Sequence, residues 1–205
     1  CLGTPMVEAM LPKVIESGIP FFAPYTGALL ARPKARNVFN IRASYPDEAE
    51  QLVQHLSTIG IKRIGVAYQN NAFGKEVFEG ARLAMEKYKV TNNSAVTIEN
   101  TGAAAAAAAT KLLADAPEAI LMGLAGKPTI DFVKAMRQQR KGMPLYALSV
   151  LGAAATLKAL GDDAVGIAVS QVVPLPNNTG VAVVRDFQLA WKQSGTALEP
   201  SHLAL

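Results

Sequence analysis

Hydrophobic residues along the chain follow two spacings in turn, one typical of amphipathic helices and the other of short buried strands. Helical stripes begin near Val7, Pro46, Ala72, Ala103, Thr129, Ala153 and Val184. The apolar runs between them predict strands over residues 19–23, 38–41, 64–68, 95–98, 119–122, 145–148 and 165–173. Strands that alternate with helices form right-handed βαβ units. The pattern therefore predicts an α/β fold built on parallel sheets.

Two loops divide this pattern into unequal parts. Residues 42–45 separate a strand from a new helix, and residues 174–179 follow the last strand. The intervening run of strands and helices can bury a whole sheet, whereas the flanking pieces cannot. We therefore predict a second lobe at residues 46–173, a partial first lobe at 1–45, and an incomplete return to that lobe at 174–205.

Composition excludes several classes of protein. Half of the 205 residues are apolar and 18% are charged, which is incompatible with a disordered chain. The apolar runs are too short to span a membrane, and the one cysteine excludes a disulfide scaffold. The formal net charge of +4 comes from scattered residues, so we expect no nucleic-acid partner.

Signatures of enzymes are missing from the sequence. His55 and His202 have no metal-binding spacing, and there is no G-x-S-x-G or G-x-G-x-x-G motif. The Gly-Lys pairs at 74–75 and 126–127 lack the serine or threonine of a phosphate loop. We therefore predict no catalytic residues, no metal and no cofactor.

The first residue has two interpretations. Cys1 could be a lipid-modified start, but a polar tether normally follows such a cysteine, and here a helix follows almost at once. We interpret Cys1 as an ordinary residue at the end of a first-lobe strand.

Polar loops follow several strands, at 24–28, 68–74, 124–126 and 149–150, and another precedes the first helix at 3–5. Each alone is compatible with ordinary helix capping. Open α/β sheets bind ligands at the carboxyl ends of their strands, so together the loops predict a cleft. Thr4, as a cap, and Pro5 would leave backbone amides free to bind a carboxylate.

These segments resemble the type I periplasmic binding proteins, specifically the branched-chain amino-acid (Leu/Ile/Val) receptors of ABC transporters. The resemblance is carried by residues 19–28, 37–45, 63–66, 72–74, 152–160 and 165–176. It implies two doubly wound parallel-sheet lobes, with hinges at 42–45 and 173–176, that close over a small ligand. It also implies a membrane permease as partner, a periplasmic location and a signal peptide upstream.

The resemblance also implies the site residues. Thr4, Thr26 and Gly27 would hold the ligand carboxylate, with Tyr25 beside them. The second lobe would contribute Tyr68, Phe73, Leu124, Ala125, Gly126, Ser149 and Val150.

The sequence departs from the family in two places. Amino-acid receptors place an acidic residue near the loop at 149–150 to pair with the ligand ammonium, and residues 147–151 contain none. An apolar or aromatic carboxylate, or an amide, therefore competes with an amino acid as the ligand. The family's opening units and closing segment also have no counterpart, so we expect the middle of a longer receptor.

Two other functions compete with the importer receptor. The ligand-sensing domain of a regulator would have the same fold, and an upstream DNA-binding helix-turn-helix would identify it. An α/β enzyme would turn over its small carboxylate, which a receptor leaves intact.

Overall fold

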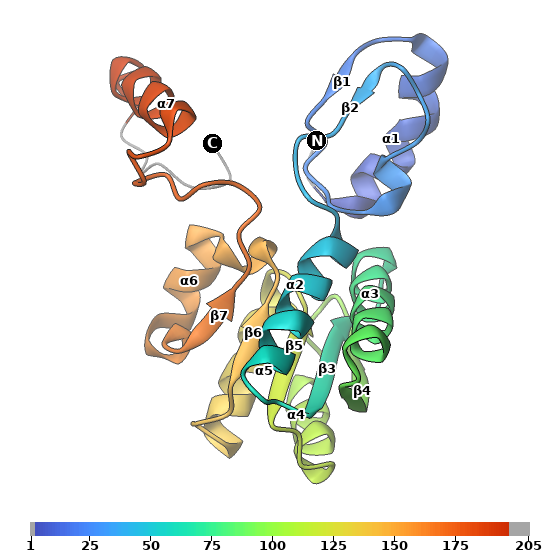
Figure 1. Cartoon of the computed structure of the whole chain (residues 1–205), viewed down its shortest axis with the longest axis vertical. Coiled ribbons are helices and arrows are strands. Elements are labelled where there is room, and N and C mark those ends of the chain that lie inside the picture. Colours follow the sequence, from blue (N-terminus) through green and yellow to red (C-terminus); the bar gives the residue numbers. More distant parts are fainter. Residues whose placement is uncertain (1–2, 197–205) are drawn as a thin grey trace.

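The computed structural model describes residues 3–196 of the chain, and its main body is a five-stranded parallel sheet (Figure 1). The strand order is β4-β3-β5-β6-β7. The strands are β3 (Arg63–Gln69), β4 (Thr91–Ile98), β5 (Ala119–Gly123), β6 (Leu145–Ala147) and β7 (Ile167–Val169). The accompanying helices are α2 (Tyr45–Thr58), α3 (Ala72–Tyr88), α4 (Ala105–Ala114), α5 (Lys127–Gln139) and α6 (Ala154–Leu160). Short 3₁₀ turns, η2 (Ser149–Gly152) and η3 (Gly161–Ala164), flank α6. We call residues 45–169 the large sheet unit.

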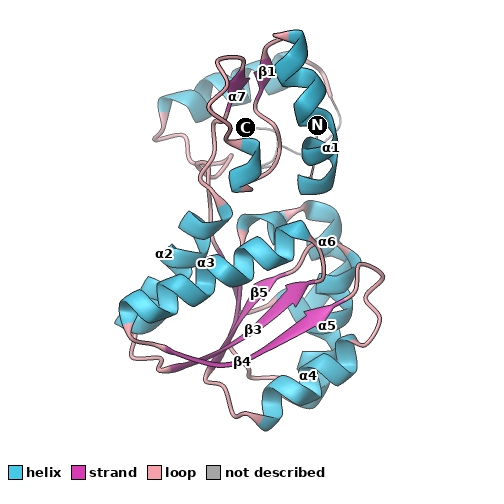
Figure 2. Cartoon of the chain, turned by 90° about the vertical axis from the view of Figure 1, so that its right-hand side faces the viewer, coloured by secondary structure: helices cyan, strands magenta, loops and turns pink. Residues whose placement is uncertain are grey.

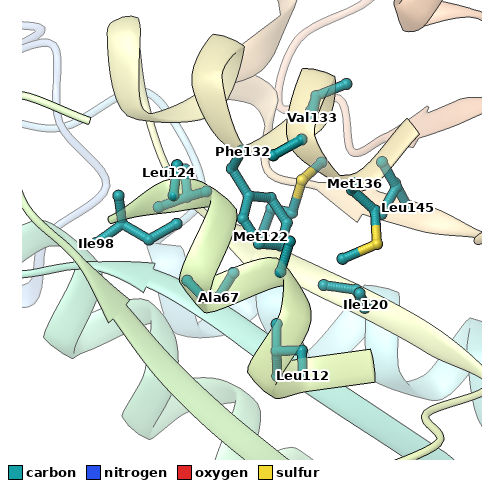
Figure 3. Close-up of a cluster of buried hydrophobic side chains, with 14 of the residues drawn as sticks. Ala67, Ile98, Leu112, Ile120, Met122, Leu124, Phe132, Val133, Met136 and Leu145 are labelled. Carbon is teal, nitrogen blue, oxygen red and sulfur yellow. The ribbon is translucent and has the colours of Figure 1, made fainter. Parts of the chain in front are cut away.

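Both faces of this sheet are covered, which explains why its central strands are apolar throughout. All of β5 is buried, and its side chains alternate between two hydrophobic clusters. Ile120 and Met122 pack against α4 and α5, where Phe132 is fully buried (Figure 3). Leu121 faces the opposite cluster, which α2 and α3 complete.

The remaining elements lie at one end of the large sheet unit (Figures 1 and 2). Helix α1 (Thr4–Ser17), β1 (Phe21–Phe22), the 3₁₀ turn η1 (Leu29–Ala31) and β2 (Val38–Phe39) form the small sheet unit, residues 3–41. Its two strands are parallel, with Phe21 opposite Val38. Helix α7 (Ala182–Gln193) follows the large sheet unit.

The chain reverses its winding direction at β3. The strand β4 lies on one side of β3 and β5 on the other, and all these pairings are parallel. Helix α3 therefore covers one face of the sheet and α4 covers the other. Such a reversal opens a crevice at the carboxyl ends of the two strands.

The sequence predicts the α/β class and the order of elements correctly, and several boundaries wrongly. The last strand covers residues 167–169 instead of 165–173, since Gly166 has a φ of 79° and Ser170 turns to bind Glu48. The strand expected at 19–23 is reduced to β1, because Pro20 has no N–H and Ala23 has a φ of 50°. The interpretations of Cys1 and His202 fall outside the described residues.

Candidate ligand-binding cleft

A cleft of about 490 Å³ lies where the two units meet. The small sheet unit contributes Gly3, Thr4, Pro5 and Tyr25. The large sheet unit contributes Tyr45, Gln69, Asn71, Phe73, Asn100, Ala125, Gly126, Val150, Ala153 and Thr156. This volume is in the range of small-molecule sites, which are about 300–1,000 Å³.

The amino end of α1 forms part of the cleft wall. Gly3 adopts a φ of 94°, which a glycine tolerates, and its N–H donates to the Tyr25 carbonyl at 2.9 Å. Gly3 is the residue that caps the helix, so the expectation that Thr4 caps it is wrong. Thr4 is instead the first helical residue, and its side chain is free to turn toward Thr26.

Thr4 and Thr26 form a buried hydroxyl pair behind this wall. Their Oγ1 atoms lie 2.8 Å apart, and Thr26 Oγ1 also accepts from the Ala28 N–H at 3.1 Å. Thr26 is fully buried, whereas Thr4 reaches the cleft. Thr26 therefore orients the Thr4 hydroxyl, which is the group of this pair that can contact a ligand.

Aromatic rings form the apolar part of the wall. Tyr45 and Phe73 pack edge to face, with ring centroids 4.8 Å apart. The Arg42 guanidinium lies 5.4 Å from the Tyr25 centroid and 5.3 Å from that of Tyr45. Burial raises the pKa of the Tyr25 phenol, and Arg42 only partly opposes this, so its hydroxyl remains a neutral donor at physiological pH.

The carboxyl end of β3 brings three further residues to the cleft. Asn71 caps α3 through its Oδ1, which accepts from the Gly74 N–H at 3.0 Å. This cap sets the corner that places Gln69 and Phe73 on the wall. An added Cβ on Gly74 would lie 2.0 Å from the Gln69 carbonyl oxygen, so only glycine fits this corner.

The lining residues carry no charged side chain. The amino ends of α1, α3 and α5 instead reach the cleft through Thr4, Asn71 and Gly126. Helix amino ends carry a partial positive charge and unpaired N–H groups. This combination favours an anion or a neutral polar group over a cation.

A buried ion pair lies next to the cleft, where the two units are joined. Arg42 pairs with Glu48 and donates to Ser149 Oγ at 3.0 Å. Glu48 Oε2 accepts from the Ser149 N–H at 2.8 Å and from Ser170 Oγ at 2.6 Å. Because Arg42 precedes α2 and Ser170 follows β7, this network links the segments through which the chain enters and leaves the large sheet unit.

Six of the site residues expected from the sequence line the cleft: Thr4, Tyr25, Phe73, Ala125, Gly126 and Val150. The other five do not, each for a local reason. Thr26 lies behind Thr4, Leu124 is fully buried in the core, and Ser149 is held in the ion-pair network. Two more are turned away by packing. Gly27 is pressed against Tyr45, which an added Cβ would approach to 2.8 Å, and Tyr68 stacks on Phe78 at 4.7 Å.

The sequence reasoning missed several lining residues. Gln69 and Asn71 belong to the loop at 68–74, in which the resemblance implies only Tyr68 and Phe73 as site residues. Asn100 is the second residue after β4, so its position near a strand end is a signal that the sequence carries. Nothing local identifies Tyr45, which reaches the cleft from the first turn of α2.

Two general searches give negative results within residues 3–196. None of the helices described there is long and apolar enough to cross a membrane. In the same part of the chain, no three His, Cys, Asp or Glu side chains are grouped so as to hold a metal ion.

Comparison with known proteins identifies the family. The model of the periplasmic binding protein family matches residues 1–205, so the chain belongs to this family. It is similar to the substrate-binding periplasmic protein of Ralstonia solanacearum, at 31% identity and a TM-score of 0.87, over 99% of this chain and 58% of that one. It also resembles a possible leucine/isoleucine/valine-binding protein of Rhodopirellula baltica SH 1, at 29% identity and a TM-score of 0.85, over 99% and 56% of the two chains.

A third structure shares the fold at lower identity. The ABC-transporter solute-binding protein of R. palustris in complex with benzoate is 19% identical, with a TM-score of 0.85 over 99% of this chain and 56% of that one. The chain therefore spans less than two thirds of each of these relatives. No curated protein matches it. The resemblance to type I periplasmic binding proteins is confirmed, as is the α/β fold with parallel sheets.

Proposed function

We propose that this protein is the extracytoplasmic solute receptor of an ABC importer and that its ligand is a small apolar or aromatic carboxylate. Family membership and the solute-binding relatives support the receptor role. In this proposal residues 46–173 are the second lobe, and residues 1–45 and 174–205 belong to the first. The crossings at 42–45 and 173–176 act as hinges, the closed form is presented to a permease, and the ligand leaves chemically unchanged.

One observation supports the ligand class above all others: the cleft combines three helix amino ends with no acidic side chain among its lining residues. An ammonium group enclosed there would lose its water without gaining a carboxylate partner. A ligand carboxylate would be stabilised by the α1 amino end, the Thr4 hydroxyl and the neutral Tyr25 phenol. The rings of Tyr45 and Phe73 would cover the apolar part of the ligand.

Thermal-shift measurements on the complete protein test this assignment with matched ligands. Valine and 3-methylbutanoate share a carbon skeleton and differ in the α-amino group, and benzoate and benzamide differ in charge. We expect 3-methylbutanoate and benzoate to stabilise the protein. A ligand at 100 times its Kd adds about 2.7 kcal/mol to the stability of the native state. Equal or greater stabilisation by valine would favour an amino-acid receptor. Greater stabilisation by benzamide would favour an amide.

Turnover separates the receptor from an enzyme. We expect chromatography to recover the stabilising acid unchanged after prolonged incubation with the protein. A product that accumulates with time would contradict the receptor role and support an α/β enzyme.

A further inference from the structure

Three side-chain amides meet on the cleft wall formed by the large sheet unit. Asn100 Oδ1 accepts from Gln69 Nε2 at 2.7 Å and from Asn71 Nδ2 at 2.9 Å. All three residues line the cleft. We call Gln69, Asn71 and Asn100 the amide triad.

Backbone donors fix which way each amide of the triad faces. The Ala125 N–H can only donate, so the Gln69 atom 3.2 Å from it is the oxygen and Nε2 faces Asn100. The Gly74 N–H fixes Asn71 in the same way, with Oδ1 toward the helix and Nδ2 toward Asn100. Since two donors converge on one atom of Asn100, that atom must be its oxygen.

The Asn100 amide nitrogen is consequently turned away from its neighbours. Within residues 3–196 the Asn100 Nδ2 has no hydrogen-bond acceptor, although Asn100 itself lies on the cleft wall. An amide with a fixed oxygen presents its N–H donors in one direction without a loss of side-chain freedom upon binding. Such preorganised donors contribute to selectivity, because they reject ligands that leave them unpaired.

Charges near the triad favour a neutral acceptor. The Glu99 carboxylate, which precedes Asn100 in the chain, accepts from Asn70 Nδ2 at 2.9 Å. Lys127, at the start of α5, is already paired with Asp131. A second anionic group of the ligand would therefore approach the Glu99 carboxylate, and Lys127 would not compensate because it is already paired.

We propose that Asn100 is a specificity-determining residue that donates a hydrogen bond to an uncharged oxygen of the ligand, on a part of the molecule other than its carboxylate. This inference rests on the proposed carboxylate ligand and adds a second polar group to it. Thr4 and Tyr25 contact the carboxylate from the small sheet unit, and Asn100 contacts the second oxygen from the large sheet unit. A carbonyl, hydroxyl or ether substituent on an aromatic acid has the required chemistry.

Calorimetric titration of the complete protein with near-isosteric acids tests this role. The probes are benzoate, the 3- and 4-acetylbenzoates, and the 3- and 4-isopropylbenzoates, so that each matched pair differs in a carbonyl oxygen. One neutral hydrogen bond changes affinity by roughly fivefold. We therefore expect at least one acetyl compound to bind about five times more tightly than its isopropyl partner, with benzoate as the reference for the carboxylate end.

Two variants then assign the preference to the Asn100 nitrogen. Asn100→Asp keeps the oxygen that Gln69 and Asn71 bind and replaces the donor by an acceptor, so the acetyl preference should vanish or reverse. Asn100→Ala should abolish it as well. Asn92→Asp adds the same charge at an exposed position of β4 that does not line the cleft, and the affinity ratio of the acetyl and isopropyl compounds should stay as in the original protein.

The outcomes separate this inference from the proposed function. The role of Asn100 is overturned if benzoate binds but neither acetyl compound binds more tightly than its isopropyl partner. It is also overturned if the acetyl preference persists in both Asn100 variants. Either result leaves the carboxylate receptor supported. If none of the acids binds, the ligand class is wrong and the role of Asn100 falls with it.

Discussion

Arg42 and Glu48 form an ion pair in which the two side chains are only 5% and 2% exposed. Glu48 also accepts from the Ser149 N–H and from Ser170 Oγ, so its carboxylate is satisfied by η2 and by the segment that follows β7. Among the described residues, Arg42 Nε and Nη1 have no hydrogen-bond partner, and the guanidinium lies over the rings of Tyr25 and Tyr45. The charges are thus kept behind the cleft wall, where they join the segment before α2 to the segment after β7.

Removing the charge of Glu48 should strongly destabilise the protein. Glu48→Gln keeps the shape of the side chain and leaves the Arg42 guanidinium buried without its counter-charge. Breaking a buried pair in this way costs about 3–5 kcal/mol. We expect a loss of this size in urea unfolding of the complete protein.

The double variant Arg42→Met with Glu48→Gln should recover part of the loss, because no uncompensated charge remains. Glu50→Gln is the matched control on the same helix, since Glu50 pairs with Lys87 at the surface, and the unfolding midpoint should change little. If the Glu48→Gln protein has the same free energy of unfolding as the original, the ion pair does not contribute to stability.

Gly74→Ala should disrupt the corner that carries Gln69, Asn71 and Phe73. The new Cβ would lie 2.0 Å from a backbone oxygen, which cannot move as a flexible side chain could. Overpacking of this kind costs about 1–3 kcal/mol or more. We expect lower stability together with weaker binding of benzoate. Gly142→Ala, which meets no atom within 4 Å, is the control and should change neither property.

The fold follows from the sequence because its signals are local and repeated. Each main element can be recognised from its own residues alone. Examples are the apolar runs of β3 and β5 and the amphipathic faces of α2, α3 and α5. Edge strands were harder to predict, since β1, β2 and β7 are two or three residues long and depend on their single partners.

The cleft follows from the sequence in part. Loops at strand ends identify Phe73, Ala125, Gly126 and Val150, because sheet topology brings these ends together. The amide triad depends on contacts between residues 29 and 31 positions apart, and the Arg42–Glu48 pair joins residues 6 positions apart; no local pattern encodes the geometry of either. Ser149 shows the converse error, since its strand-end position suggested a ligand contact and its hydroxyl serves Arg42 instead.

Thr26→Val should weaken carboxylate binding although Thr26 does not reach the cleft. Valine fills the same volume, but it leaves the Thr4 hydroxyl and the Ala28 N–H without their partner. The Thr4 hydroxyl, no longer oriented by Thr26, would lose up to one hydrogen bond to the ligand, about 1 kcal/mol or roughly fivefold in the Kd of benzoate. Thr4→Val, which removes the contacting hydroxyl itself, should weaken binding at least as much. If calorimetry finds that both variants bind benzoate with unchanged affinity, the hydroxyl pair is not part of the carboxylate site.

Glu76 joins the two units, because its Oε1 accepts from the Leu29 N–H at 2.7 Å. Burial raises the pKa of this carboxyl above its ordinary 4.5, and the Leu29 N–H and Arg32 oppose the change only in part. A raised pKa means that the folded protein binds the proton more tightly than the unfolded chain does. The stabilisation from that proton is complete at acid pH and is lost as the pH rises through the folded-state pKa.

Glu76→Gln should therefore stabilise the protein at neutral pH, since glutamine keeps an oxygen for Leu29 and is never charged. Its Tm should exceed that of the original protein at pH 7, and the difference should vanish near pH 4. Glu79→Gln, on the same helix, should behave in the opposite way, because Arg82 lowers the pKa of Glu79 and its charge stabilises the folded state. That variant should be only slightly less stable at pH 7, because the pair is exposed, and equal at acid pH. A Tm difference for Glu76→Gln that stays constant with pH would show that the carboxyl titrates alike in both states.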